Sequence, residues 1–398
     1  MAEVHALCDA ATLGLGDGLE VLLSRKLDTL APGETLEVSS DNASIEHDLR
    51  AWSRFMAHEW KGMRVEDGRF VCSIRRGTAQ RIITKQLPLE AVAKIPQIAN
   101  PVTGFSPRGA IVEEGSPQFP FDVLDANQAW NPEAAGLYER AASSQWNATA
   151  DIPWKALPAL DSELERCVCQ LMTFLAENEF AALYVPAKWI PRIHPHFAET
   201  IMFLSTQICD EARHIEVFVK RALSNGAGLQ FSSASTERSL KTLLDREDFL
   251  EASFLLSVLG EGTFLDLLRF IEVHAPDPVT AEVARRTRID EARHVQFSLA
   301  HMKHAIESDP GFKQKLAAAA RDRASSLAEV RSVNPLVEES LIVLAAGGLA
   351  PQNLPKGVRA VRELYDSMHE NRIKRLQLIG FSADDSEVLS QSHTPNFM

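Results

Sequence analysis

The residues of this chain best suited to chemistry lie in two copies of one short acidic motif. Asp-Glu-Ala-Arg-His occupies positions 210–214 and recurs at 290–294, each time inside a long run with apolar residues at helical spacing. Residues three apart on an α-helix project from the same face, so each motif presents a carboxylate and an imidazole together. A single Glu-x-x-His pair is usually a surface pair or a core histidine, whereas two copies of the whole motif indicate a shared site.

Each motif is preceded by another apolar helical segment that contains an acidic residue. Apolar residues lead directly into Glu261, and either Glu177 or Glu179 occupies the corresponding place upstream of the first motif. We choose Glu177 over Glu179, because the residues after Glu177 repeat the Glu-x-x-Phe-x-x-Leu pattern that begins at Glu261. The sequence therefore predicts four carboxylates and two imidazoles on four helices.

This set of side chains predicts a site for two metal ions inside a helix bundle. Carboxylate is a hard ligand and imidazole a borderline one, so together they favour iron or manganese over zinc. A buried carboxylate without a partner is costly, and two cations would offset that cost on all four helices. Two bridging carboxylates would leave each metal one histidine and open positions for dioxygen. The predicted ligands are Glu177, Glu211, His214, Glu261, Glu291 and His294.

Residues next to the predicted ligands are candidates for supporting roles. Asp210 and Asp290 each precede a ligand Glu and can accept a hydrogen bond from a histidine N–H, which fixes its tautomer. Arg213 and Arg293 could neutralise these aspartates. Residues one turn from the ligands could line an apolar substrate pocket, although ordinary core packing explains each of them equally well. These pocket candidates are Phe180, Phe218, Phe264, Thr287 and Phe297.

Four long helical segments must position the ligands, and prolines separate them. The segments span about residues 161–185, 196–225, 246–274 and 279–308. The first two and the last two form an internal repeat. Three further helices are expected at 311–327, 335–346 and 356–378, followed by a tail from residue 381 that is disordered or draped over the bundle. The main domain is therefore predicted to be a four-helix bundle with extra C-terminal helices.

The first 80 residues predict a separate, small α+β domain. Residues 35–40 alternate like a strand, residues 41–56 form a helix, and Asp67-Gly68 marks a hairpin. The predicted order is β-α-β-α-β-β, a two-layer sandwich. A proline-rich stretch with buried aromatic residues then forms a connector that wraps over the bundle. The predicted domains are 1–80, 81–150, 151–308 and 309–398.

Composition narrows the possible partners and the compartment. The chain has 398 residues and a net charge of −13, which disfavours nucleic acid or an anionic membrane as the main partner. We see no apolar run long enough to span a membrane and no secretory leader, so a cytoplasmic location is expected. The five scattered cysteines are expected to be reduced thiols.

The N-terminal domain resembles the TusA/SirA sulfur-carrier family over residues 9–77. The resemblance rests on Leu-Gly-Leu at 13–15, Pro-Gly-Glu-Thr-Leu at 32–36, Asp48, and the run from Phe55 to Glu59. The family carries sulfur on a cysteine in a Cys-Pro-x-Pro motif, and that place here reads Asp17-Gly18-Leu19-Glu20. Because a carboxylate cannot form a persulfide, we expect a docking, dimerising or lid module. Cys72 is the alternative carrier, but a cysteine in mid-strand is usually inert.

Residues 151–306 resemble the ferritin-like di-iron carboxylate superfamily, particularly its oxygenase and ribonucleotide-reductase-like branch. The doubled Asp-Glu-x-Arg-His carries the resemblance, which implies the six ligands above and an antiparallel four-helix bundle. Ribonucleotide reductase small subunits place a radical tyrosine where this chain has Phe218. Arylamine N-oxygenases of the superfamily place a third histidine where this chain has Thr287. A stable tyrosyl radical is therefore not expected, and the seventh ligand of that N-oxygenase subgroup is missing.

These features predict a non-haem di-iron oxygenase or oxidase that activates O2 and oxidises a small organic molecule. Carbon hydroxylation and amine N-oxygenation are the leading reactions, with Fe/Fe expected and Mn/Fe the alternative. No nucleotide fingerprint is present, so a separate ferredoxin or flavin reductase would supply electrons. A homodimer is expected. The alternative hypotheses are a non-catalytic, peroxide-scavenging or ligand-binding di-metal protein, and a sulfur-pathway enzyme that acts on a thiol.

Overall fold

The computed structural model describes residues 3–78, 90–112, 117–327 and 334–393. The chain divides into two compact units, Met1–Val92 and Ala93–Met398, each with its own hydrophobic core. The predicted fold class is confirmed: a small α+β unit precedes a mainly α-helical one. Among the described residues, no helix is both long and apolar enough to cross a membrane.

The first unit contains a four-stranded sheet and two helices in the predicted β-α-β-α-β-β order. The strand order is β1-β2-β4-β3, with β1 parallel to β2 and the other pairs antiparallel. Asp67 and Gly68 both adopt positive φ, at 49° and 82°, as a tight hairpin between β3 and β4 requires. The elements are β1 Ala6–Ala11, α1 Leu19–Asp28, β2 Thr35–Ser40, α2 Ile45–Phe55, β3 Glu59–Glu66 and β4 Arg69–Arg75.

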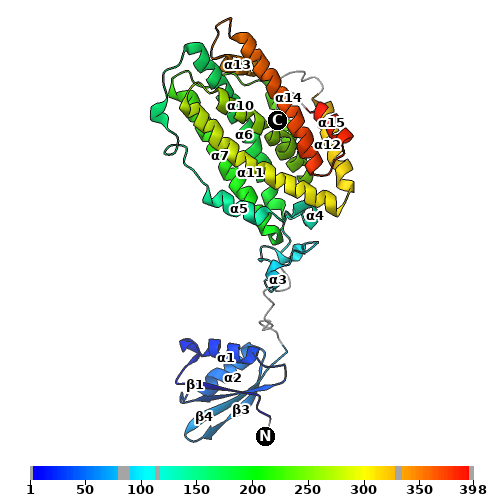
Figure 1. Ribbon diagram of the computed structural model, residues 1–398. Coiled ribbons are helices and arrows are strands. Elements are labelled where there is room, and N and C mark those ends of the chain that lie inside the picture. Colours follow the sequence, from blue (N-terminus) through cyan, green and yellow to red (C-terminus); the bar gives the residue numbers. More distant parts are fainter. Residues whose placement is uncertain (1–2, 79–89, 113–116, 328–333, 394–398) are drawn as a thin grey trace. The chain divides into compact units, whose positions relative to one another are not determined.

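The second unit is built on two helical hairpins. Helix α6, Ser162–Trp189, packs on α7, Ala198–Ser224, and α10, Gly262–His274, packs on α11, Pro278–Ser308. The short connections at 190–197 and 275–277 make the partners in each hairpin antiparallel, and α7 contacts α11 between the hairpins. Figure 1 shows these helices lying along one another. Helix α6 continues through Pro186, where the sequence had predicted a break.

The helix that carries Glu261 is not a regular α-helix. It begins as α9, Phe249–Ser253, widens into the π-helical segment η6, Phe254–Glu261, and continues as α10. Every residue of η6 is buried. Short π-helical stretches within α-helices occur frequently at functional sites, because the wider turn changes the direction of the side chains that follow.

The remaining helices surround this bundle. The stretch from residue 93 to 150 contributes Trp146 and other residues to the bundle's hydrophobic core. The C-terminal residues after 381 include a helix, not the irregular tail expected, and Ser382 caps it by accepting a hydrogen bond from the Asp385 N–H. These helices are α4 Ala126–Ala129, α5 Ala134–Ser143, α8 Ala234–Leu244, α12 Gly311–Ser326, α13 Pro335–Ala346, α14 Leu354–Leu378 and α15 Ala383–Gln391. The short helix α3, Glu90–Ala93, falls where the sequence passes from the first unit to the second.

A buried ion network ties three elements together near one end of the bundle. Arg221 of α7 is fully buried and donates to Glu165 of α6 at 2.6 and 3.2 Å. It also donates to Asp277 at 3.1 Å and to the Thr280 hydroxyl at 2.7 Å. Asp277 in turn caps the start of α11. Arg221 therefore sets the spacing of the helices that carry both acidic motifs.

Replacing Arg221 with methionine leaves two buried carboxylates without their shared cation. Removing one partner of a buried ion pair costs about 3–5 kcal/mol, so we expect Arg221→Met to lower the free energy of unfolding by about that amount. Urea unfolding followed by far-UV circular dichroism measures the loss. Lys220 is the matched control, because its partners among the described residues, Glu216 and Thr149, lie near the surface. Lys220→Met should therefore cost less than about 1 kcal/mol. Equal losses in the two variants would contradict this role of Arg221.

Candidate metal centre

Six buried side chains from four helices converge in the middle of the bundle. Among the described residues, they form two overlapping groups of four donors, each able to hold one metal ion. Glu211 of α7 and Glu291 of α11 belong to both groups. The first group is completed by Glu179 and His214, and the second by Glu261 and His294.

The two shared carboxylates each face both imidazoles. One oxygen of Glu211 lies 3.0 Å from Nδ1 of His214, and its other oxygen lies 3.0 Å from Nδ1 of His294. The two oxygens of Glu291 make the same pair of approaches, at 3.3 Å each. A carboxylate that presents one oxygen to each side is arranged to bridge two cations. The Nδ1 atom of each histidine would then bind one metal ion, and Glu211 and Glu291 would be shared by both ions.

The donor atoms are incompletely satisfied by the protein. Oε1 of Glu179, Oε2 of Glu261 and both oxygens of Glu291 are buried and have no hydrogen-bond donor among the described residues. Unpaired buried carboxylates are costly, and more so when several lie together. Two cations coordinated by these oxygens would remove that cost, so the residues present fit a dinuclear metal site.

The pKa values of the carboxyl groups diverge within this cluster. Burial, together with the negative charge of Glu291, raises the pKa of Glu179 and of Glu261 well above the usual range. Burial acts in the same direction on Glu211, but His294 and His214 outweigh it and hold the pKa of Glu211 far below the usual range. The imidazoles thus favour the charged form of Glu211.

Each histidine is oriented by the aspartate of the opposite motif. Nε2 of His214 lies 3.2 Å from Asp290, and Nε2 of His294 lies 3.3 Å from Asp210. With Nε2 hydrogen-bonded to a carboxylate, Nδ1 is left free to bind a metal. The contacts run from α7 to α11 and back, so the aspartate that orients each imidazole comes from the other motif.

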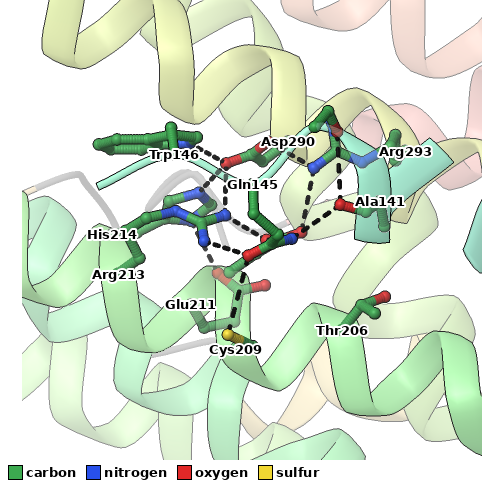
Figure 2. Close-up of polar contacts among 12 residues, drawn as sticks. Ala141, Gln145, Trp146, Thr206, Cys209, Glu211, Arg213, His214, Asp290 and Arg293 are labelled. Atoms are coloured by element: carbon green, nitrogen blue, oxygen red, sulfur yellow. Dashed lines mark hydrogen bonds and ion pairs between the residues drawn. The ribbon is translucent and has the colours of Figure 1, made fainter. Parts of the chain in front are cut away.

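Two arginines link the aspartates into one network, part of which Figure 2 shows. Arg213 and Arg293 each form an ion pair with the aspartate of their own motif and a second one, at 3.1 Å, with the aspartate of the other. The four side chains alternate in charge, and all are buried. The network holds α7 against α11 behind the two imidazoles.

The sequence did not predict the contributions of Gln145 and Trp146, which follow α5. The Trp146 indole N–H donates to Asp290 at 2.7 Å, and its ring lies 4.9 Å from the Arg213 guanidinium (Figure 2). The Gln145 side chain donates to Asp210 at 3.1 Å and accepts from Arg213. No spacing pattern in the sequence connects these residues with motifs that lie more than sixty positions further along.

Gln207 is a further residue that the sequence reasoning missed. Its side-chain amide donates to Oε1 of Glu261 at 2.9 Å, and both groups are buried. The sequence could have indicated Gln207, because this residue lies one helical turn before Glu211 and therefore on the same face of the helix.

The structure corrects the choice between Glu177 and Glu179. Glu179 points into the donor cluster, whereas Glu177 faces Glu237 and Ser232. Burial and the neighbouring Glu237 raise the pKa of Glu177 to about 7. The Glu-x-x-Phe-x-x-Leu pattern predicted the wrong glutamate. The buried face of α6 runs from Glu179 through residues 182 and 185, and Phe180 does not belong to it.

The pocket candidates fall into two classes. Phe180 is 46% exposed and stacks on Tyr184, so it does not line an interior pocket. The others are buried: Phe218, Phe264, Thr287 and Phe297. Phe297 stacks on Phe203, with ring centroids 4.3 Å apart, and the Phe203 centroid lies 6.4 Å from that of His294. The Thr287 hydroxyl is buried without a hydrogen-bond partner among the described residues.

Comparisons with known proteins found similarity at the level of structure. No protein-family model matched the chain, and no curated protein did. Among solved structures, a variant R2-like ligand-binding oxidase with aerobically reconstituted Mn/Fe cofactor is 20% identical, covering 63% of this chain and 93% of that one, with a TM-score of 0.46. An R2-like ligand-binding oxidase with a metal cofactor after photoconversion is 18% identical, covering 67% and 95%, with a TM-score of 0.45. At this level of similarity, the residues of the chain itself must carry the functional inference.

The geometry predicts different effects for two neighbouring glutamates of α6. We expect Glu179→Ala to lose one of the two metal ions, because it removes a ligand from one donor group only. Glu177→Ala, two positions away, should bind metal like the parent protein. Inductively coupled plasma mass spectrometry on protein loaded with Fe(II) under anaerobic conditions measures both. Equal metal content in the two variants would refute the placement of Glu179 as a ligand.

Proposed function

We propose that this protein is a dinuclear non-haem metal oxidase or oxygenase that acts on a small organic molecule. The observation that carries the proposal is the arrangement of Glu211 and Glu291, each of which presents one oxygen to each of two buried imidazoles. Glu179 with His214, and Glu261 with His294, would then complete the two metal positions. Two iron ions are our first choice and a manganese–iron pair the second, since oxygen-rich sites with imidazole suit both metals.

A reduced pair of such metals would supply the redox chemistry that O2 activation requires. The protein's own part is positioning and exclusion of water. The network of Asp210, Asp290, Arg213 and Arg293 holds each imidazole with Nδ1 toward the site. Buried aromatic rings, including Phe203 and Phe297 beside His294, keep the surroundings apolar. Such a shell protects a strong oxidant from reaction with water.

The residues near the site favour a small and largely apolar substrate. Phe218, Phe264 and Phe297 supply apolar surface, and Thr287 offers one hydroxyl that could hydrogen-bond a polar group of the substrate. Hydroxylation of carbon and oxygenation of an amine are both compatible with this lining. We propose that a ferredoxin or a flavin reductase delivers the electrons, and that the chain acts in the cytoplasm as a homodimer.

We propose a docking role, without sulfur transfer, for the N-terminal unit and retain its resemblance to the TusA/SirA family. The order of its strands and helices supports the resemblance. Its two cysteines, Cys8 and Cys72, are buried, and burial raises the pKa of both thiols, that of Cys72 to about 11. A protonated, enclosed thiol is a poor sulfur carrier. Detection of a persulfide on the purified chain by mass spectrometry would instead favour the sulfur-pathway hypothesis.

Oxygen uptake tests the proposed chemistry. We expect the parent protein, loaded with Fe(II) without air and then exposed to oxygen, to consume O2 in proportion to its bound iron. Glu211→Ala removes a ligand from both donor groups, so it should lower iron content and O2 uptake by at least about tenfold, the scale that loss of a ligand-orienting group already reaches. His294→Ala removes a ligand from one group only, so it should lose about half of the bound iron and lower O2 uptake. Glu216→Ala is the control, because that side chain lies at the surface of the same helix.

A protein that binds iron but consumes no O2 would contradict the oxidase proposal. Rapid loss of added hydrogen peroxide without O2 uptake would favour the peroxide-scavenging alternative.

A further inference from the structure

The turn that precedes Glu261 has an unusual backbone. Within η6 the hydrogen bonds span a wider turn than in an α-helix, and the Gly262 N–H donates to the Ser257 carbonyl, five residues earlier. Regular α-helical geometry resumes at Gly262, directly after the proposed ligand. The direction in which Glu261 points therefore depends on keeping this turn wide.

An arginine from the C-terminal part of the chain contacts this turn. Nε of Arg375, on α14, donates to the carbonyl oxygen of Val258 at 3.1 Å. Its guanidinium lies directly against Gly262: a Cβ atom at that position would stand 2.4 Å from Nε and 2.7 Å from Cζ. Residue 262 must therefore lack a side chain for Arg375 to occupy this place.

A second arginine of α14 supports the same segment. Nη2 of Arg372 donates to the Thr263 hydroxyl at 3.2 Å, and that hydroxyl donates to the Leu259 carbonyl at 2.6 Å. Arg372 is itself held by Ser390 of α15, through two hydrogen bonds of 3.1 Å. Two carbonyls of the π-helical segment, those of Val258 and Leu259, thus accept hydrogen bonds from side chains.

These arginines are costly to bury, and simple packing does not require them. Both are nearly inaccessible to solvent, and arginine is rarely buried without a specific partner. An apolar residue would fill the space between α14 and α10 with less desolvation. Asp266 lies near both guanidinium groups, and its interactions with them offset part of their charge. What an apolar residue cannot provide is a donor for the carbonyl of Val258.

We propose that Arg375 is a positioning residue for Glu261, and through it for the metal ion that Glu261 and His294 would hold. By hydrogen bonding to Val258 and filling the space above Gly262, Arg375 stabilises the wide turn that directs Glu261 toward the site. The inference rests on the proposed dinuclear centre. The inference predicts an effect at one metal position only. Among the described contacts, Arg375 touches the segment that carries Glu261 and does not touch Glu179 of α6.

Two variants test the inference by different routes. Arg375→Met removes the donor but keeps much of the apolar volume. Gly262→Ala keeps Arg375 but displaces its guanidinium, while alanine itself favours a helix by about 1 kcal/mol over glycine. We expect the parent protein to bind about two Mn(II) ions per chain and each variant about one, the ion beside Glu179 being kept. Glu179→Ala is the control that loses the other ion.

Electron paramagnetic resonance distinguishes the outcomes beyond metal content. A pair of Mn(II) ions bridged by two carboxylates gives a spin-coupled spectrum, and a single ion gives the signal of isolated Mn(II). We expect the isolated signal from both variants, with the melting temperature of the metal-free chain unchanged for Gly262→Ala. If both variants still showed the spin-coupled spectrum, the positioning role of Arg375 would be overturned, and the proposed function would stand. A parent protein that binds no metal pair would overturn the proposed function, and this inference with it.

Discussion

The fold of the second unit depends on one constraint, the burial of four carboxylates and two imidazoles within a few ångströms of one another in an apolar bundle. Such a cluster is unfavourable without cations to balance it. The surrounding residues reduce that cost in steps: Asp210 and Asp290 accept from the imidazoles, and Arg213 and Arg293 balance the aspartates. The remaining imbalance lies at the carboxylate oxygens that face inward, and there two metal ions would act.

The sequence predicted those ligands of the cluster that recur at helical spacing. The doubled motif predicted Glu211, His214, Glu291 and His294 because a ligand pair three residues apart needs only one helix face, and Glu261 stood out against its apolar neighbours. Glu177 was chosen wrongly over Glu179, because a spacing pattern does not reveal which line of a long buried helix faces inward. Contacts made across the fold, such as that of Trp146 with Asp290, leave no pattern in the sequence, since the partners lie on separate elements.

The two halves of the internal repeat are similar in sequence but differ in backbone. Helix α6 carries Glu179 on a continuous α-helix, whereas Glu261 ends a π-helical segment that α14 buttresses. Among the described contacts, Gln207 donates a hydrogen bond to Glu261 and makes none with Glu179. The two metal positions would therefore differ in the backbone that holds one ligand and in the hydrogen bonding of that ligand. That difference offers a physical basis for two metals of unequal properties, whether of one element or of two.

The exchange of aspartates between the two motifs has a consequence for how the site could have arisen. His214 relies on Asp290 and His294 relies on Asp210, so a single helical hairpin, folded alone, would possess an imidazole without the aspartate that orients it. A lone ancestral hairpin could have built the same centre only by pairing with a second copy of itself.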